Sequence, residues 1–179
     1  MGYRHDRHDL IQAGIAVVLE DGVGALTFGR VAKVLGISDR MVVYYFASKE
    51  VLVTEVVAVM GLEMQSLLEK AFGDSMTSEE MMRVAWPVLS NSKVDSLMAV
   101  FFEVVGLASA RKQPFVTLSA GLIESWVDWI TDRVEGESVA LRRKSALSIV
   151  ARIDGLLMIR QICGPRAAND AARAMGIAD

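Results

Sequence analysis

The sequence has a single cysteine, Cys163, and two histidines, His5 and His8, among its 179 residues. A lone cysteine excludes an internal disulfide and a zinc site built from several thiolates, which fits a reducing cytoplasm. The two histidines lie beside Asp6 and Asp9 in "HDRHD", but no third ligand stands elsewhere in the chain. We therefore expect a polar arm or frayed first turn at the N-terminus rather than a metal site.

Motifs that carry catalysis are also missing. The sequence contains no P-loop, no G-x-G-x-x-G and no Ser/His/Asp arrangement. Cys163 stands far along the chain from both histidines, so nucleophilic chemistry has little support. We expect neither an enzyme nor a resident cofactor.

Prolines are few, three in all, and no segment alternates cleanly between apolar and polar residues, so strands are not expected. No uncharged apolar run reaches about 18 residues, and the N-terminus lacks the apolar core of a secretory signal. Hydrophobic residues make up 53% of the chain, enough for a sizeable core. These patterns predict an all-α cytoplasmic protein with no membrane span.

Apolar residues recur at helical spacing along almost the whole chain, interrupted by short stretches rich in Gly, Ser, Asn, Asp or Pro. The spacing predicts about nine helices, at residues 6–21, 28–35, 39–46, 49–72, 77–90, 94–111, 115–134, 139–163 and 167–175. Pro87 is expected to kink or divide the fifth. Three short helices followed by longer ones indicate two domains, 1–48 and 49–179, the second a helical bundle.

Charge is distributed unevenly. The net charge is −3, yet residues 1–50 carry six Lys/Arg and six Asp/Glu and are neutral overall. Binding of these residues to DNA would therefore depend on local placement of cations rather than on bulk charge. The basic run Arg142, Arg143 and Lys144 reads as a solvated edge and not as a second nucleic-acid patch.

The stretch "LTFGRVAKVLGISDRMVVYYFASKEVLV", residues 26–53, is the most informative. Thr27 is a good N-cap for one short helix, Gly36 suits its left-handed end, and Ser38 is placed to cap the next. Two short helices joined by a tight glycine turn form the helix-turn-helix arrangement.

The second helix of this stretch has two distinct sides. Its spacing turns Val42 and Phe46 inward, which leaves a surface of other residues facing out: Arg40, Met41, Val43, Tyr44 and Tyr45. Ser48 then resembles an N-cap, so Lys49 falls in the first turn of a helix, where a bound phosphate would meet both its ammonium and free backbone N–H groups. Simple solvation of Lys49 is the alternative.

At these residues the sequence resembles the DNA-binding region of TetR-type transcriptional regulators, over residues 7–60. The resemblance is carried by Gly22, Leu26, Thr27, Val31, Ala32, Gly36, Ile37, Ser38, Tyr45, Phe46, Lys49 and Leu52. A shorter stretch, "IDGLLM" at Ile153–Met158, is similar to one found in late helices of the family.

The resemblance implies DNA contacts by position. Thr27, Tyr45 and Lys49 match positions that grip phosphates. The positions that face bases or the adjoining backbone are matched by Asp39, Arg40, Met41, Val43 and Tyr44, with Ser38 and Arg30 as further expected contacts. The sequence departs from the family at Val43, where a tyrosine is most common, and at Gly29, where some relatives place a basic residue that Arg30 would have to replace.

For the rest of the chain, the resemblance implies a ligand pocket and a dimer interface. Expected pocket residues are Trp86, Phe101, Phe102, Glu103 and Trp126; the aromatic ones read equally as plain core, and Glu103 as a solvated or paired carboxylate. The helices at 115–134 and 139–163 are candidates for an intersubunit four-helix bundle. Expected interface residues are Trp129, Ala151, Gly155, Leu156 and Ile159.

The sequence thus predicts a homodimeric TetR-like regulator, most often a repressor in this family, that binds a palindromic operator and is released by a small, mainly apolar effector. The alternative is an all-α small-molecule-binding protein or enzyme whose first helices serve protein contacts. A regulator whose pocket is filled by its own side chains is a third reading.

Overall fold

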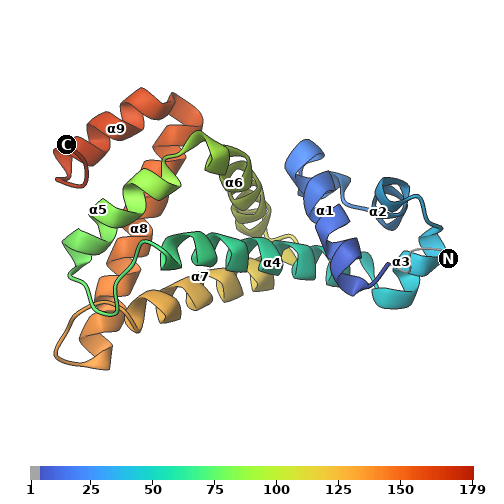
Figure 1. The fold of residues 1–179 in the computed structure, drawn as a ribbon, viewed down its shortest axis with the longest axis horizontal. Helices are drawn as coiled ribbons and strands as arrows, with labels where there is room; N and C mark the ends of the chain where they lie inside the picture. The colour runs from blue at the N-terminus through green and yellow to red at the C-terminus, as the bar shows by residue number, and fades with distance from the viewer. Residues whose placement is uncertain (1–4) are drawn as a thin grey trace. The chain divides into compact units, whose positions relative to one another are not determined.

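The structure is a computed structural model that describes residues 5–179. Within that range the chain is all-α and contains no strand. The helices, labelled in Figure 1, are α1 (Arg7–Asp21), α2 (Phe28–Leu35), α3 (Asp39–Tyr45), α4 (Lys49–Glu69), α5 (Ser78–Leu89), α6 (Asp95–Ser109), α7 (Phe115–Thr131), α8 (Val139–Cys163) and α9 (Pro165–Ala174), with 3-10 turns η1 (Val23–Ala25) and η2 (Ser92–Val94). The predicted fold class is confirmed, and each helix lies where the spacing predicted it. Pro87 lies in the last turn of α5 and does not divide the helix, since only two residues follow it before the helix ends.

The chain forms two compact units. The first comprises the described part of Met1–Glu63 together with Val100–Ser119, and the second comprises Met64–Ala99 and Ala120–Asp179. The first unit therefore includes much of α6, a helix distant from it in sequence. The predicted division into 1–48 and 49–179 follows the sequence rather than these packed units, and it stays a prediction.

The first unit is built around α1, which packs against α2, and α2 packs against α3. Asp6 caps α1 through a capping box with Asp9, so the acidic "HDRHD" segment is an ordered helix start rather than a frayed turn. Gly14 allows α1 and α4 to approach closely, since a Cβ there would lie 2.7 Å from a methyl of Val56. The least exposed side chains of this core are Leu10, Val17, Val18, Val23, Leu26, Val31, Ala32, Val42, Phe46, Leu52, Val56 and Val104.

A carboxylate from α6 fastens the connection between α1 and α2. The two oxygens of Glu103 accept hydrogen bonds from the backbone N–H of Val23 at 2.8 Å and of Gly24 at 3.1 Å. Both amides belong to η1, so the carboxylate satisfies donors that this short turn leaves open. We call this pair of hydrogen bonds the Glu103 clamp. Gly22, at φ 82°, leaves room for it, because a Cβ there would lie 2.7 Å from Oε2 of Glu103.

Helix α4 is apolar enough to raise the question of a membrane. A window of 18 residues within this 21-residue helix has a mean hydropathy of 1.6, which passes a test of length and composition alone. The criterion of an uncharged run did not select it because Glu55 and Glu63 interrupt it. Its apolar residues Leu52, Val56 and Met60 recur at helical spacing and are buried, as in the core helix of a folded domain.

In the second unit, α8 packs against α5 and α9. The last turn of α8 is tied to the start of α6 by Arg160, which donates to both oxygens of Asp95 at 2.7 and 3.0 Å. Gln161 adds a hydrogen bond of 2.9 Å to the backbone carbonyl of Asp95. This bidentate arrangement fixes geometry as well as charge, and it keeps the almost fully buried guanidinium paired.

Two features of α8 bear on assembly and pH. An apolar strip on its surface, which we call the α8 face, consists of Leu147, Ala151, Met158 and Ile162, all exposed. Asp154 borders this face at helical spacing from Ala151 and Met158. Burial raises the pKa of Asp154 from its usual 3.8 to about 6, and no hydrogen bond or ion pair within the described residues compensates for the buried charge.

The first prediction concerns the clamp. Replacing Glu103 with Gln keeps the size of the side chain but removes one acceptor, which leaves the Val23 or Gly24 amide unsatisfied. We expect the free energy of unfolding to fall by about 1–3 kcal/mol, measured by urea denaturation. Glu137→Gln, at an exposed position, should change it by no more than about 0.5 kcal/mol. Equal stability of the two variants would contradict the clamp.

The second prediction concerns Asp154. Because its pKa is raised in the folded state, its contribution favours folding below the unfolded pKa and is lost as the pH rises through about 6. Asp154→Asn should therefore be more stable relative to the unchanged protein at pH 7.5 than at pH 4.5, by denaturation at one fixed protein concentration. Asp74→Asn, at an exposed site, should show no such pH-dependent difference. A gain for Asp154→Asn that is the same at both pH values would contradict the raised pKa.

Candidate nucleic-acid interface

The turn between α2 and α3 has the geometry that its sequence predicts. The Thr27 hydroxyl accepts a hydrogen bond of 3.2 Å from the backbone N–H of Arg30 and so caps α2. Gly36 ends α2 in the left-handed region at φ 66°, and the N–H of Ile37 returns to the carbonyl of Ala32 at 3.0 Å. This closed turn fixes the direction in which α3 leaves α2.

Ser38 differs from the expectation. It occupies the N-cap position of α3 and is exposed, but its hydroxyl makes no capping hydrogen bond. The first turn of α3 therefore keeps N–H groups without a side-chain cap, next to Asp39. The Asp39 carboxylate lies beside Gly29, where a Cβ would be 3.3 Å from Oδ2, so the absence of a side chain at Gly29 makes room for it.

Helix α3 buries one side and exposes the other. Val42 and the following Phe46 are fully buried, as predicted. The residues on the opposite side, which we call the α3 face, are all exposed: Asp39, Arg40, Met41, Val43 and Tyr44. Tyr44 is the most exposed of the large side chains here, at 82%. Arg40 makes no hydrogen bond or ion pair with any described residue.

The two tyrosines of "YYF" have different surroundings. Tyr45 is half-buried, and its hydroxyl donates a long hydrogen bond of 3.4 Å to the backbone carbonyl of His5. Tyr44 contacts Tyr45 edge to face with ring centres 5.2 Å apart. The sequence predicts that both tyrosines lie on the surface, available to the DNA backbone. In the structure only Tyr44 is freely exposed, whereas Tyr45 is half-buried within the first unit.

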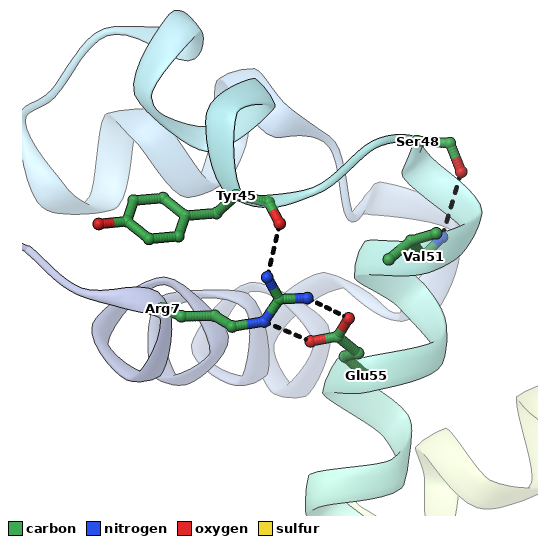
Figure 2. A network of polar contacts seen from close by, with 5 residues as sticks. All are labelled: Arg7, Tyr45, Ser48, Val51 and Glu55. Atoms are coloured by element: carbon green, nitrogen blue, oxygen red, sulfur yellow. Dashed lines mark hydrogen bonds and ion pairs between the residues drawn. The ribbon is translucent and has the colours of Figure 1, made fainter.

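Arg7 joins three helices at the end of α3 (Figure 2). Its guanidinium forms a bidentate ion pair with Glu55 of α4 and donates a hydrogen bond of 2.7 Å to the backbone carbonyl of Tyr45. It also lies over the Phe46 ring, 4.7 Å from the ring centre. The hydrogen bonds to Glu55 raise the pKa of Arg7, so the charge is permanent. Sequence reasoning missed this residue because its partners lie 38 and 48 positions away.

The start of α4 lies directly after α3. The Ser48 hydroxyl accepts a hydrogen bond of 3.3 Å from the N–H of Val51, as Figure 2 shows, which makes Ser48 the predicted cap. Lys49 is the first residue of α4 and is exposed; its ammonium lies 3.5 Å from the carbonyl oxygen of Gly24. That contact is long enough to leave the ammonium available to an anion at this helix end.

The cations near α3 thus divide into two groups. Arg7 and Arg30 are ion-paired, Arg30 with Asp21 at the end of α1. Arg40 and Lys49 are exposed and have no carboxylate partner among the described residues. Arg30 would have to leave Asp21 to reach DNA. Two cations of this surface are therefore free of carboxylate partners, although the first 50 residues are neutral overall.

The expected pocket residues fall in both units. Phe101 and Phe102 contact each other edge to face at 5.3 Å, and the adjacent Glu103 forms the clamp on η1. In the second unit, Trp86 is buried at 3% exposure, and Trp126 contacts Trp129 at 5.6 Å. A role for any of them in binding a ligand stays a prediction.

The expected interface residues also differ in exposure. Leu156 is 1% exposed and belongs to the core of its own unit, whereas Ala151 is exposed and Gly155 and Ile159 are half-buried. Trp129 stacks on Phe72 with ring centres 5.2 Å apart.

Known proteins were compared with the chain by sequence and by structure, and the sequence match falls on the helix-turn-helix described above. Residues 10–56 match the family described as "Bacterial regulatory proteins, tetR family". No curated protein sequence matches the chain.

Among solved structures, a TetR-family regulator from Rhodococcus sp. superposes with a TM-score of 0.74 at 16% identity, covering 96% of each chain. The multidrug binding protein EbrR, complexed with imidazole, gives 0.70 at 17% identity, covering 97% of this chain and 96% of that one. FadR from Bacillus subtilis, in complex with stearoyl-CoA, gives 0.61 at 16% identity and covers 96% of each. The family match thus covers the helix-turn-helix region, and the chain as a whole shares the fold of these solved structures.

Proposed function

We propose that the chain is a repressor that binds a palindromic DNA operator as a homodimer and is released from it by a small, mainly apolar effector. The observation that carries the proposal is the exposed α3 face, with Arg40 unpaired on it and Lys49 at the start of the next helix. A short exposed helix after a closed glycine turn is the form in which helix-turn-helix proteins enter the major groove.

Arg40 and Lys49 have different roles in this proposal. Arg40 is in the first turn of α3, where an arginine can form a bidentate contact with guanine. Lys49 is at the N-terminus of α4, where its ammonium and the open N–H groups meet a phosphate. Thr27, Ser38 and Tyr44 add uncharged donors to the backbone. Base contacts then specify the sequence, and phosphate contacts fix the position.

The homodimer is proposed to form through α8. Its exposed face consists of apolar side chains, with Ile162 at 76% and Met158 at 47% exposure, and exposed apolar patches mark contact surfaces. In this dimer a two-fold axis pairs the α8 face of one protomer with the same face of its partner. The operator then has two half-sites, one for each α3, with centres about 34 Å apart. Leu156 is buried in the core of its own unit and would stabilise α8 without contacting the partner.

The effector is proposed to be mainly apolar because aromatic side chains are available in the parts of the chain beyond the DNA-binding helices. A structure of the same fold, FadR from Bacillus subtilis, holds stearoyl-CoA, and the acyl chain of that ligand supports an apolar class of effector. Release would follow from a population shift: DNA binds one conformation, the effector binds another, and each lowers the affinity for the other by the same factor. Helix α4, continuous from Lys49 to Glu69, is the proposed carrier of this coupling.

The third prediction tests the DNA interface on duplexes selected from a random library. Arg40→Ala should weaken binding to the selected duplex by about 1–3 kcal/mol and relax the preference at one position in each half-site. Lys49→Ala should weaken binding to all duplexes alike and lower the salt slope by about one per subunit. Both are measured by fluorescence anisotropy over a range of salt concentrations.

Lys144→Ala is the matched control, since it removes an exposed lysine from the second unit and should leave both quantities unchanged. If no duplex is enriched, the proposal is wrong. If Arg40→Ala preserves the selected sequence while Lys49→Ala alters it, DNA binding stands but the orientation assigned to α3 is wrong.

The fourth prediction tests the dimer. Ile162→Asp places a charge on the α8 face, and we expect sedimentation at micromolar concentration to shift from dimer to monomer with loss of operator binding. Val139→Asp is the control, because Val139 is 63% exposed on the same helix but lies outside the α8 face. A monomer in the unchanged protein would exclude the proposed assembly.

A further inference from the structure

Val43 is an apolar side chain near the middle of the α3 face. It is 51% exposed and lies one helical turn after Arg40. Its neighbours on that face, Met41 and Tyr44, are 40% and 82% exposed. The buried residues Val42 and Phe46 fix the rotation of α3, so this exposure follows from the packing of the helix.

A single exposed valine is ordinary on a protein surface. Here, however, three of the seven residues of α3 are large, hydrophobic and exposed, on the face whose only charged groups are Asp39 and Arg40. An apolar surface gains nothing from phosphates, which are charged and hydrated. On the base edges of the major groove, the apolar group on offer is the C5-methyl of thymine.

We propose that Val43 is a specificity-determining residue that contacts the C5-methyl of a thymine beside the guanine read by Arg40. The inference rests on the proposed function, in which α3 enters the major groove. It adds a constraint on the operator sequence: each half-site contains a guanine and a thymine at a fixed separation.

The helix geometry sets that separation. Three residues along an α-helix advance about 4.5 Å, at about 1.5 Å per residue. Base pairs follow one another at about 3.4 Å along a strand. With α3 lying along the groove, the contacts of Arg40 and Val43 therefore fall about one to two base pairs apart.

The side chain suits this use. Valine is branched at Cβ and is stiff at χ1, so little rotamer freedom is lost when its methyl groups meet a fixed surface. Its partial exposure also means that apolar area remains to be buried on contact. Met41, on the flank of the face, is longer and more flexible and is less able to discriminate between bases that differ by one methyl group.

The experiment uses the duplex selected by the full-length protein. Thymines are replaced one at a time by deoxyuridine, symmetrically in both half-sites, which removes only the C5-methyl. We expect the replacement to lower the affinity roughly fourfold per half-site at one position only. That position should lie within two base pairs of the guanine for which Arg40→Ala loses its preference. Replacement at the other thymines should have little effect.

Val43→Ala should bind the thymine duplex more weakly and should no longer distinguish thymine from deoxyuridine at that position. Val34→Ala is the control, because Val34 is an equally exposed valine, at 54%, on α2; it should retain the wild-type discrimination. Circular dichroism confirms that each variant keeps its helices.

The inference is overturned if the unchanged protein binds every deoxyuridine duplex as tightly as the thymine duplex, or if Val43→Ala keeps the discrimination. In either case, enrichment of a specific duplex would leave the proposed function intact. A selection that enriches no duplex would overturn both together.

Discussion

The contacts of Arg7 hold α1, α3 and the start of α4 in place. A single guanidinium pairs with Glu55 of α4, donates a hydrogen bond to the carbonyl of Tyr45, the last residue of α3, and covers the Phe46 ring. An exposed ion pair alone contributes little to stability, but the bidentate geometry restricts position. Because the link between α3 and α4 is only three residues long, this restraint also sets the distance between Arg40 and Lys49.

Ion pairs and helix caps within the first unit decide which of its charges stay available. Asp6 and Asp9 cap α1, and Asp21 pairs with Arg30, so these groups are engaged within the unit. Arg40 and Lys49 have no carboxylate partner among the described residues, and neither does Lys33 of α2. Because Asp39 and Glu50 are exposed beside Arg40 and Lys49, a contact with DNA here would depend on the placement of single cations and not on net charge.

Much of the fold could be predicted from the sequence because it depends on local signals. The Thr27 cap, the left-handed Gly36 and the Ser48 cap act within a few residues, and apolar spacing placed the helices between them. Contacts between distant segments could not be predicted in this way. Glu103 meets η1 across about 80 residues.

The candidate site shows the same division. Burial of Val42 and exposure of Arg40 follow from helical periodicity within α3. The half-buried state of Tyr45 and the missing cap at Ser38 depend on where other segments lie. The raised pKa of Asp154 likewise comes from desolvation by the surrounding packing, and a sequence pattern gives no measure of that.

The Glu103 clamp has a consequence for modularity. The compact unit that carries α1 to α3 takes in residues 100–119, so the unit with the helix-turn-helix is not a contiguous piece of chain. A chimera that exchanged only the first 63 residues would leave the Val23 and Gly24 amides without their carboxylate and would uncover the side of the core that Val104 fills. Transplanting α1 to α3 onto another protein of this fold therefore requires the matching stretch of α6 as well, and a substitution in one of these two segments constrains the other.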